Sequence, residues 1–142
     1  MLAIVAPGQG SQTPGFLYPW IEDAQLKSTL AEFSEMIGLD LLHLGTLADA
    51  DEIRDTSNAQ PLIVGAGILG MKALGGINFS ITAGHSVGEI TSAAIAGVIS
   101  ELDAMRLVRE RGAAMAVAAA QTPTGMSAVP PAEASRGKLF AP

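Results

Sequence analysis

Ser86 lies at the centre of the segment Gly-His-Ser-Val-Gly, which has the Gly-x-Ser-x-Gly spacing of a nucleophile elbow. In an elbow the chain turns sharply from a strand into a helix and presents the serine hydroxyl outward. Gly84 and Gly88 suit this turn because residues without a Cβ let strand and helix approach closely. The helix that follows would offer the free N–H of Val87 to a developing oxyanion. The segment therefore predicts nucleophilic chemistry at Ser86.

The surroundings of the motif decide between this interpretation and a simpler one. A pattern of five positions is weak evidence in a chain with 16 glycines. The simpler interpretation is a tight packing turn with a buried serine. However, the apolar residues from Ile81 precede the motif as a strand would, and an amphipathic run follows it as a helix would. This context favours the elbow.

Composition indicates one globular domain. Of 142 residues, 49% are hydrophobic and only 15% are charged, which is enough apolar material for a core. The net charge of −6 without a basic cluster argues against a nucleic-acid groove. No cysteine is present, so disulfides, thiolate zinc sites and a cysteine nucleophile are excluded. No apolar run approaches the roughly 18 residues of a membrane span, so we expect a cytoplasmic protein without a membrane segment.

Periodicity and capping signals predict an α/β fold in which a parallel sheet has flanking helices. The expected elements are a buried strand at 2–7, a helix at 22–37, a short helical turn at 38–45, a helix capped by Asn58 from about 59–61 to 74, a buried strand ending at Gly84, a helix from Ser86 to Ala96, a helix at 101–121 capped by Ser100, and a strand at 124–129. We therefore place one domain at 1–129. Residues 130–142, rich in proline and small residues, are expected to be an unstructured tail.

Four segments in order resemble the malonyl-CoA:acyl-carrier-protein transacylases of fatty-acid and polyketide synthesis. The first is the loop Gly-Gln-Gly-Ser-Gln at 8–12, directly after the first predicted strand. It is followed by Ala-Gln-Pro at 59–61, by the elbow at 84–88 and by Leu-Val-Arg-Glu-Arg-Gly at 107–112. The resemblance runs from Met1 to about Val129, which is nearly all of this chain but only about the first half of the family's. It implies the large, α/β-hydrolase-like subdomain of an acyltransferase.

The resemblance implies a two-step acyl transfer. Ser86 would attack the thioester of malonyl-CoA and hold the malonyl group as an ester, and the phosphopantetheine thiol of an acyl carrier protein would then collect it. The backbone N–H groups of Gln9 and Val87 would form the oxyanion hole. Arg111 matches the arginine that binds the free malonyl carboxylate, a task for which a planar guanidinium is suited. Gln60 would line the substrate pocket. Coenzyme A enters as substrate, and no metal or redox cofactor is suggested.

The general base is missing from the motifs. His85 is adjacent to Ser86, and a neighbour at a sharp turn generally points elsewhere, so we expect a packing or hydrogen-bonding role for it. His43 lies in an apolar helical turn far along the chain and is expected to be structural. In the family the catalytic histidine lies in the second half, together with a ferredoxin-like small subdomain. The present sequence holds neither.

A parallel sheet must be covered on both faces, so a chain of this extent is expected to expose an apolar edge or helix face. We therefore expect the isolated chain to be unstable, oligomeric or aggregated, with self-association through that surface. We also expect its transacylase activity to be very low, because a serine without its base retains only residual rate. The partial extent is compatible with a fragment, a frameshift or a natural short form.

Two other functions stay open beside malonyl transfer. A non-catalytic fragment or remnant of the enzyme is favoured if Ser86 cannot be acylated. An α/β-hydrolase-type esterase would use the same elbow, but the glutamine loop and Arg111 have no evident purpose there. The expected partners are malonyl-CoA and an acyl carrier protein, although Arg106, Arg109, Arg136 and Lys138 are too few to establish a basic docking patch. Fatty-acid and polyketide pathways both remain open, as does a bulkier branched malonyl unit.

Overall fold

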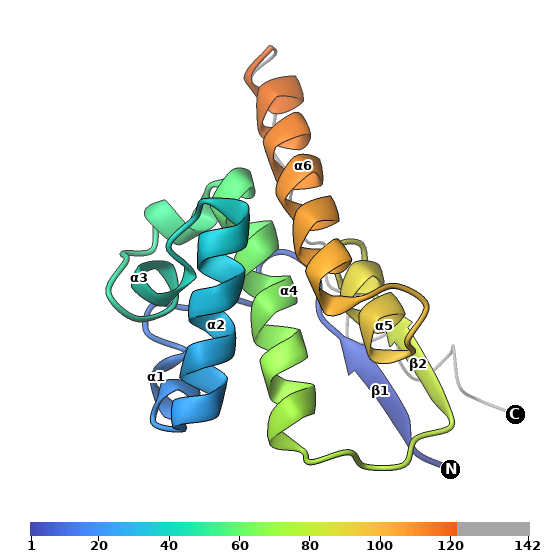
Figure 1. Cartoon of the computed structure of the whole chain (residues 1–142). Helices are drawn as coiled ribbons and strands as arrows, with labels where there is room; N and C mark the ends of the chain where they lie inside the picture. Colours follow the sequence, from blue (N-terminus) through green and yellow to red (C-terminus); the bar gives the residue numbers. More distant parts are fainter. Residues whose placement is uncertain (122–142) are drawn as a thin grey trace, which may run out of the picture.

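The fold is described from a computed structural model, which describes residues 1–121 (Figure 1). The predicted strand at 124–129 and the predicted tail lie outside this range. The elements in chain order are β1 (Ala3–Ala6), α1 (Tyr18–Ile21), α2 (Ala24–Ile37), α3 (Leu41–Thr46), the 3₁₀ turn η1 (Glu52–Arg54), α4 (Thr56–Ala73), β2 (Ile81–Gly84), α5 (Gly88–Ile95) and α6 (Glu101–Ala120).

The predicted α/β class with a parallel sheet and flanking helices is confirmed. β1 and β2 pair in parallel, with Ala3 opposite Ile81 and Ala6 opposite Gly84. The strands lie side by side and α5 packs along them, while α4 stands between α2 and α6 (Figure 1). The end of α6 projects beyond the other elements (Figure 1). Because parallel strands point the same way, the C-terminal ends of β1 and β2 meet at one edge of the sheet, where the glutamine loop and the elbow both begin.

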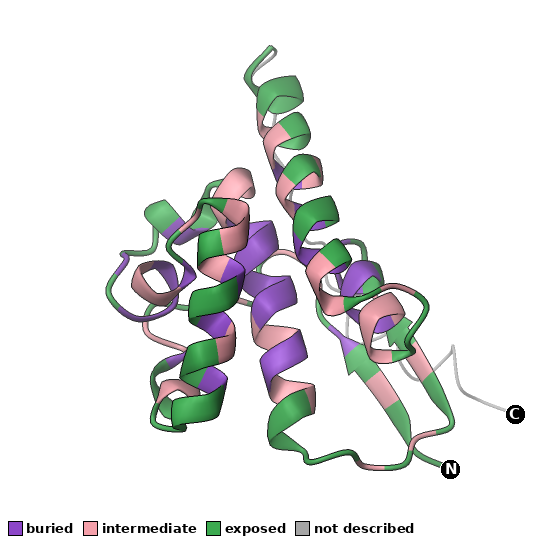
Figure 2. Cartoon of the chain, in the orientation of Figure 1, coloured by how far each residue is buried: buried purple, intermediate pink, exposed green. Residues whose placement is uncertain are grey.

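The core is centred on α4, which is the most continuously buried helix (Figure 2). Its apolar residues pack against α2 and α3 on one side and against α5 and α6 on the other. The fully buried side chains include Leu62, Val64 and Leu69 of α4, Phe33 of α2 and Met105 of α6. α4 is therefore the central helix against which α5 and α6 pack.

The predicted start of α4 was wrong. The helix begins at Thr56, and Asp55 is its N-cap, accepting a hydrogen bond from the Ser57 N–H. Pro61 consequently lies inside the helix, where its missing N–H leaves the carbonyl of Ser57 without its usual partner. The Arg109 guanidinium of α6 donates to that carbonyl at 3.2 Å. A polar contact from the neighbouring helix therefore compensates for the proline, and sequence periodicity does not reveal this.

The other helices follow the predictions more closely. α2 begins two residues late because Asp23 caps it, and α3 continues past Gly45 to Thr46. α1 and η1 were not predicted. At α6 the predicted cap is confirmed, since the Ser100 hydroxyl accepts the Asp103 N–H at 3.0 Å. The hydrogen bond from the same hydroxyl, together with nearby Arg106, lowers the pKa of the exposed Asp103 carboxyl below its ordinary value of 3.8.

The prediction that both strands are buried was wrong for one face of the sheet. Ile4, Ala6, Thr82 and Gly84 face α5 and are at least partly buried. The residues on the opposite face, which we call the outer sheet face, are all exposed: Ala3, Val5, Ile81 and Ala83. Among residues 1–121, then, the sheet has cover on one face, and its other face has the apolar exposure that we expected.

The outer sheet face generates the first testable prediction. Val5 is 73% exposed and Ile81 is 56% exposed, so the chain should self-associate in solution by covering these side chains. Replacing both with threonine keeps strand propensity while making the face polar, and sedimentation velocity should then show a shift toward monomer. Leu47→Thr, which changes an equally exposed leucine beyond α3, serves as the control. A wild-type chain that sediments as a monomer would contradict the prediction.

Candidate active site

Ser86 occupies the sharp turn between β2 and α5. Its φ of 54° lies in the left-handed region, and it is the one non-glycine residue with positive φ within residues 1–121. Such a conformation costs about 1–3 kcal/mol and persists only where the surroundings enforce it. The side chain is exposed, whereas Val87 beneath it is fully buried. The structure therefore presents the hydroxyl outward and excludes the buried-serine alternative.

Close backbone contacts enforce this turn. A Cβ built on Gly84 would collide with the backbone of Gly88, and one built on Gly88 would collide with the carbonyl of Ala6 and lie 2.6 Å from that of Pro7. The His85 N–H donates to the Ala6 carbonyl at 3.1 Å, so the turn stays in register with β1. The two glycines are thus required by packing against each other and against β1.

The glutamine loop lies against the elbow. A Cβ on Gly8 would clash with the His85 ring and lie 3.0 Å from the His85 carbonyl, so the loop and the residue before the serine are in contact. Within residues 1–121, neither the Gln9 N–H nor the Val87 N–H donates a hydrogen bond. Val87 directly follows Ser86, and Gln9 belongs to the loop that contacts His85, the residue before the serine, so both unused donors belong to the segments that meet at the elbow.

Arg111 reaches Ser86 from α6. Its Nη2 donates to the Ser86 Oγ at 3.3 Å, and its Nη1 donates to the Gln60 Oε1 at 2.5 Å. Gly112 allows this reach, because a Cβ there would lie 3.1 Å from the Thr56 carbonyl, so α6 packs closely on the start of α4. The other two arginines of the helix are used differently: Arg106 pairs with Asp103, and Arg109 holds the Ser57 carbonyl. Of these three arginines, Arg111 is thus the one that contacts the Ser86 hydroxyl.

Gln60 of α4 is 1% exposed, so it is buried beneath Arg111. Its carboxamide joins three groups, accepting from Arg111 and donating to the Gln9 Oε1 at 3.5 Å and to the Met115 Sδ at 3.2 Å. The Gln9 carboxamide in turn donates to the Thr56 Oγ1 at 3.1 Å, a contact that the sequence did not predict. The buried amide connects the cation to the glutamine loop.

A cleft of about 560 Å³ opens beside Ser86. It lies between α5 and α6. The surface that lines it is mostly apolar, and its polar side chains are the serine, the arginine and two glutamates. Arg111 is the one cation among these residues, and it lies beside the hydroxyl. The cleft can therefore hold an acyl chain near Ser86 with an anionic end at the guanidinium. Its lining residues are Ser86, Glu89, Ile90, Leu107, Glu110, Arg111 and Ala114.

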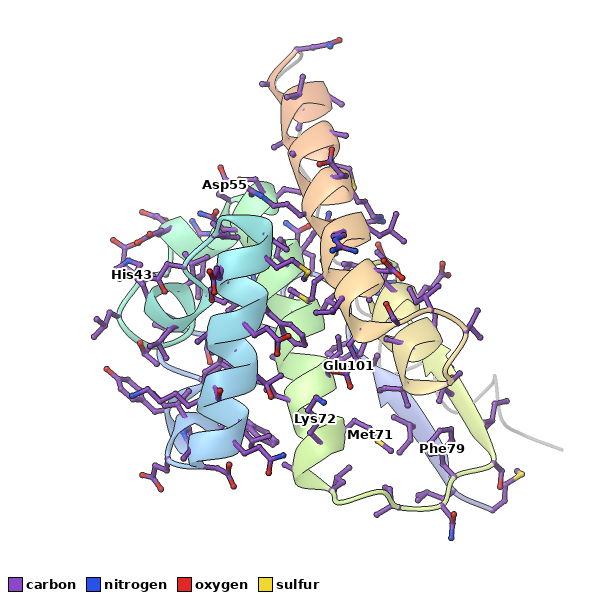
Figure 3. The ribbon with its side chains drawn as sticks, viewed as in Figure 1. His43, Asp55, Met71, Lys72, Phe79 and Glu101 are labelled. Atoms are coloured by element: carbon purple, nitrogen blue, oxygen red, sulfur yellow. The ribbon has the colours of Figure 1, made fainter. Side chains whose placement is uncertain are left out.

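Neither histidine activates Ser86 in this structure. The His85 ring lies over Gly8, in the packing role that the sequence suggested. His43 is on α3, across the molecule from β2 (Figure 3), and its Nε2 contacts the Glu52 carboxylate at 3.2 Å. Within residues 1–121, no histidine or carboxylate side chain hydrogen-bonds to the Ser86 Oγ. The same part of the chain has no cluster of three or more His, Cys, Asp or Glu side chains that could hold a metal ion, and no helix there is both long and apolar enough to span a bilayer.

The fold agrees with that of a known protein family. The sequence pattern of the acyl transferase domain matches residues 4–139, and the chain belongs to this family. Among its relatives, the malonyl CoA-acyl carrier protein transacylase of Mycobacterium tuberculosis is 51% identical over 135 residues, and that of Salmonella typhimurium is 38% identical over 136. These matches cover 91% and 89% of this chain but 44% and 42% of the relatives. The chain therefore spans less than half the length of these proteins.

Solved structures agree with this assignment. The crystal structure of the transacylase from Mycobacterium tuberculosis superimposes with a TM-score of 0.80 at 48% identity, over 87% of this chain and 42% of that one. A malonyl-transacylase solved in complex with a type II polyketide synthase acyl-carrier protein gives a TM-score of 0.75 at 35% identity, over 86% of this chain and 40% of that one.

The elbow contacts predict a position-specific response to added methyl groups. Gly84→Ala and Gly88→Ala should each lower the free energy of unfolding by about 1–3 kcal/mol or more, because backbone atoms must move to admit the Cβ. Gly70→Ala is the matched control, since its Cβ would meet only the Trp20 ring, at 3.7 Å, and alanine favours the helix. Urea denaturation measures all three. Tolerance of alanine at both elbow positions would contradict the packing described.

Proposed function

We propose that this chain provides the nucleophile and the carboxylate-binding arginine of a malonyl-CoA:acyl-carrier-protein transacylase. The observation that carries the proposal is the 3.3 Å hydrogen bond from the Arg111 guanidinium to the exposed hydroxyl of Ser86. A cation this close to the nucleophile suits a short acyl group with a second, anionic end. Malonyl fits this description, because its free carboxylate is one methylene removed from the thioester carbonyl.

The proposed reaction has two transfers. The Ser86 Oγ attacks the thioester carbonyl carbon of malonyl-CoA, its proton passes to a base, and the C–S bond breaks to release the coenzyme A thiol with that proton. The malonyl group remains on Ser86 as an oxygen ester. The phosphopantetheine thiol of the carrier protein then attacks this ester, the C–O bond breaks, and the proton returns to Ser86. The two thiols and the Ser86 hydroxyl account for every bond formed and broken in the two steps.

The chain's own residues have three roles in this scheme. The N–H groups of Gln9 and Val87, which are unused within residues 1–121, would hold the oxyanion of each tetrahedral intermediate. Arg111 would turn from the Ser86 Oγ to the malonyl carboxylate, gripping both oxygens. Gln60 would keep the guanidinium in place from below through its 2.5 Å contact, so we now assign it to positioning rather than to direct substrate contact.

The base must come from elsewhere than residues 1–121, where no histidine or carboxylate reaches Ser86. We therefore propose that efficient transfer requires the part of the family's fold that lies beyond the matched 44% of a relative. Without the base, the rate should fall by a factor on the order of 10⁶, as loss of a catalytic histidine does in serine hydrolases. The fatty-acid or polyketide pathway, the carrier protein and the cytoplasmic location remain predictions within this proposal.

Two variants of the proposal have distinct outcomes. A non-catalytic remnant is supported by the absence, among the side chains of residues 1–121, of a base at Ser86, and it predicts no acylation even when the missing part is supplied. An esterase predicts hydrolysis of uncharged esters without preference for malonyl, which gives Arg111 no role.

Complementation tests the proposal directly. The chain is mixed with the C-terminal part of the Mycobacterium tuberculosis relative, malonyl-CoA is added, and intact mass is followed with time. We expect a stoichiometric malonyl adduct on Ser86 and transfer to carrier protein in the mixture, with very slow acylation of the chain alone. Ser86→Ala is the control and should give no adduct. Absence of any adduct in the complemented mixture would contradict the proposal, whereas rapid acylation of the chain alone would show that the base is not needed.

Arg111 should govern acyl selectivity. In the complemented mixture, Arg111→Ala should slow malonyl transfer by about 10²-fold, because charged hydrogen bonds to the carboxylate are lost, and should leave acetyl transfer nearly unchanged. Arg111→Lys should recover little, since lysine cannot bind both carboxylate oxygens and Gln60 at once. Arg106→Ala, on an exposed position of the same helix, is the control. Equal losses for malonyl and acetyl substrates would exclude carboxylate recognition by this residue.

A further inference from the structure

The last glutamine of the glutamine loop has no role in the chemistry above, yet it makes two well-formed hydrogen bonds. The Gln12 Oε1 accepts the Gly10 N–H at 2.9 Å, and its Nε2 donates to the Ile53 carbonyl at 2.9 Å. One end of the carboxamide therefore holds the residue after Gln9, and the other end is anchored on η1. Only a side chain with both a donor and an acceptor can make this pair of contacts.

A second hydrogen bond holds the loop through the side chain of Gln9. The Gln9 Nε2 donates to the Oγ1 of Thr56, which is the first residue of α4. Ile53 and Thr56 belong to the stretch that leads from η1 into α4, and Ile53 is itself buried in the core. The loop is thus attached at two points to the segment that joins η1 to α4.

The loop needs such tethers because its own backbone is permissive. Gly10 has a φ of 103°, and nothing lies within 4 Å of where its Cβ would be. Residues 8–12 belong to no helix or strand. A glycine-rich segment of this kind samples many conformations unless side chains fix it, whereas an oxyanion donor must be in place before reaction.

We infer that Gln12 and Thr56 are positioning residues, which hold residues 8–12 through the pairs Gln12–Ile53 and Gln9–Thr56 so that the Gln9 N–H is fixed beside Ser86. The inference rests on the proposed function for its catalytic consequence, but the tethering itself does not. The glutamine side chains thereby acquire a role separate from that of the backbone: the side chains hold the loop, and the N–H group binds the oxyanion.

The test uses Gln12→Met and Thr56→Val, which keep size and remove hydrogen bonding, in the complemented mixture. We expect acylation of Ser86 by malonyl-CoA to slow by about 10- to 100-fold, less than the 10²–10³-fold that loss of an oxyanion donor itself costs. The dissociation constant for malonyl-CoA should not change, and hydrogen exchange at residues 8–12 should become faster. A general structural defect would instead also raise exchange in α4 and weaken malonyl-CoA binding.

Matched variants separate the two hydrogen bonds from side-chain volume. Thr56→Ser should restore the rate because it keeps the hydroxyl, and Gln12→Glu should not, because it keeps the acceptor for Gly10 but loses the donor to Ile53. Gln25→Met at an exposed position of α2 and Thr29→Val at a half-buried position of the same helix are the controls and should match the wild type. Rates within about twofold of wild type for Gln12→Met and Thr56→Val would overturn the inference.

Failure of the proposed function can be told apart from failure of this inference. If the wild-type mixture forms no malonyl adduct, the proposed function fails, and hydrogen exchange at residues 8–12 then decides the inference alone. Faster exchange in both variants with α4 unchanged supports tethering, and unchanged exchange overturns it.

Discussion

The contact between the backbone of Gly88 and the end of β1 is the constraint on which this site depends. Because the carbonyls of Ala6 and Pro7 lie where a Cβ would be, α5 can begin only directly against the sheet. That leaves too little room for a gradual turn, and Ser86 adopts a φ of 54° between strand and helix. The strain is offset by burial of Val87 and by the hydrogen bond from His85 to Ala6. The outward hydroxyl is therefore a consequence of close packing.

The second requirement is a cation held beside that hydroxyl by a partly buried polar network. Arg111 and Arg109 both tie α6 to α4, the former through Gln60 and the latter through the carbonyl that Pro61 leaves free. Gly112 lets the helices approach closely enough for these contacts. Buried amide and guanidinium groups are costly unless paired, so this network also fixes one relative position of the two helices.

The sequence indicated candidate residues for the site, but it did not indicate how their surroundings pack. Ser86 and Val87 could be placed because a strand, a turn and a helix are consecutive in sequence, and Arg111 and Gln9 because the family resemblance supplied contacts between distant segments. The start of α4 was missed because Asp55 and Asn58 are both good caps, and only the Arg109 contact makes Pro61 acceptable within the helix. Gln60 was assigned to a pocket surface because its burial depends on α6 packing over it.

The exposure of the strands is the other instructive difference. An alternation of polar and apolar residues could not reveal this exposure, because every strand residue except Thr82 is apolar or glycine, and such strands normally have cover on both sides. Thr56 and Gln12 were missed as partners for a different reason, because side-chain contacts between a loop and a helix start have no periodic pattern. The one signal in the sequence for a role of Gln12 was its place in the segment at 8–12, which resembles the loop of the family.

The most direct test of the account is a crystal structure of this chain with malonate bound. We predict that the hydroxyl of Ser86 faces the cleft with a positive φ, and that the Arg111 guanidinium binds both oxygens of one malonate carboxylate while keeping its hydrogen bond to Gln60. A structure with that hydroxyl turned into the interior, or with malonate bound away from Arg111, would contradict it.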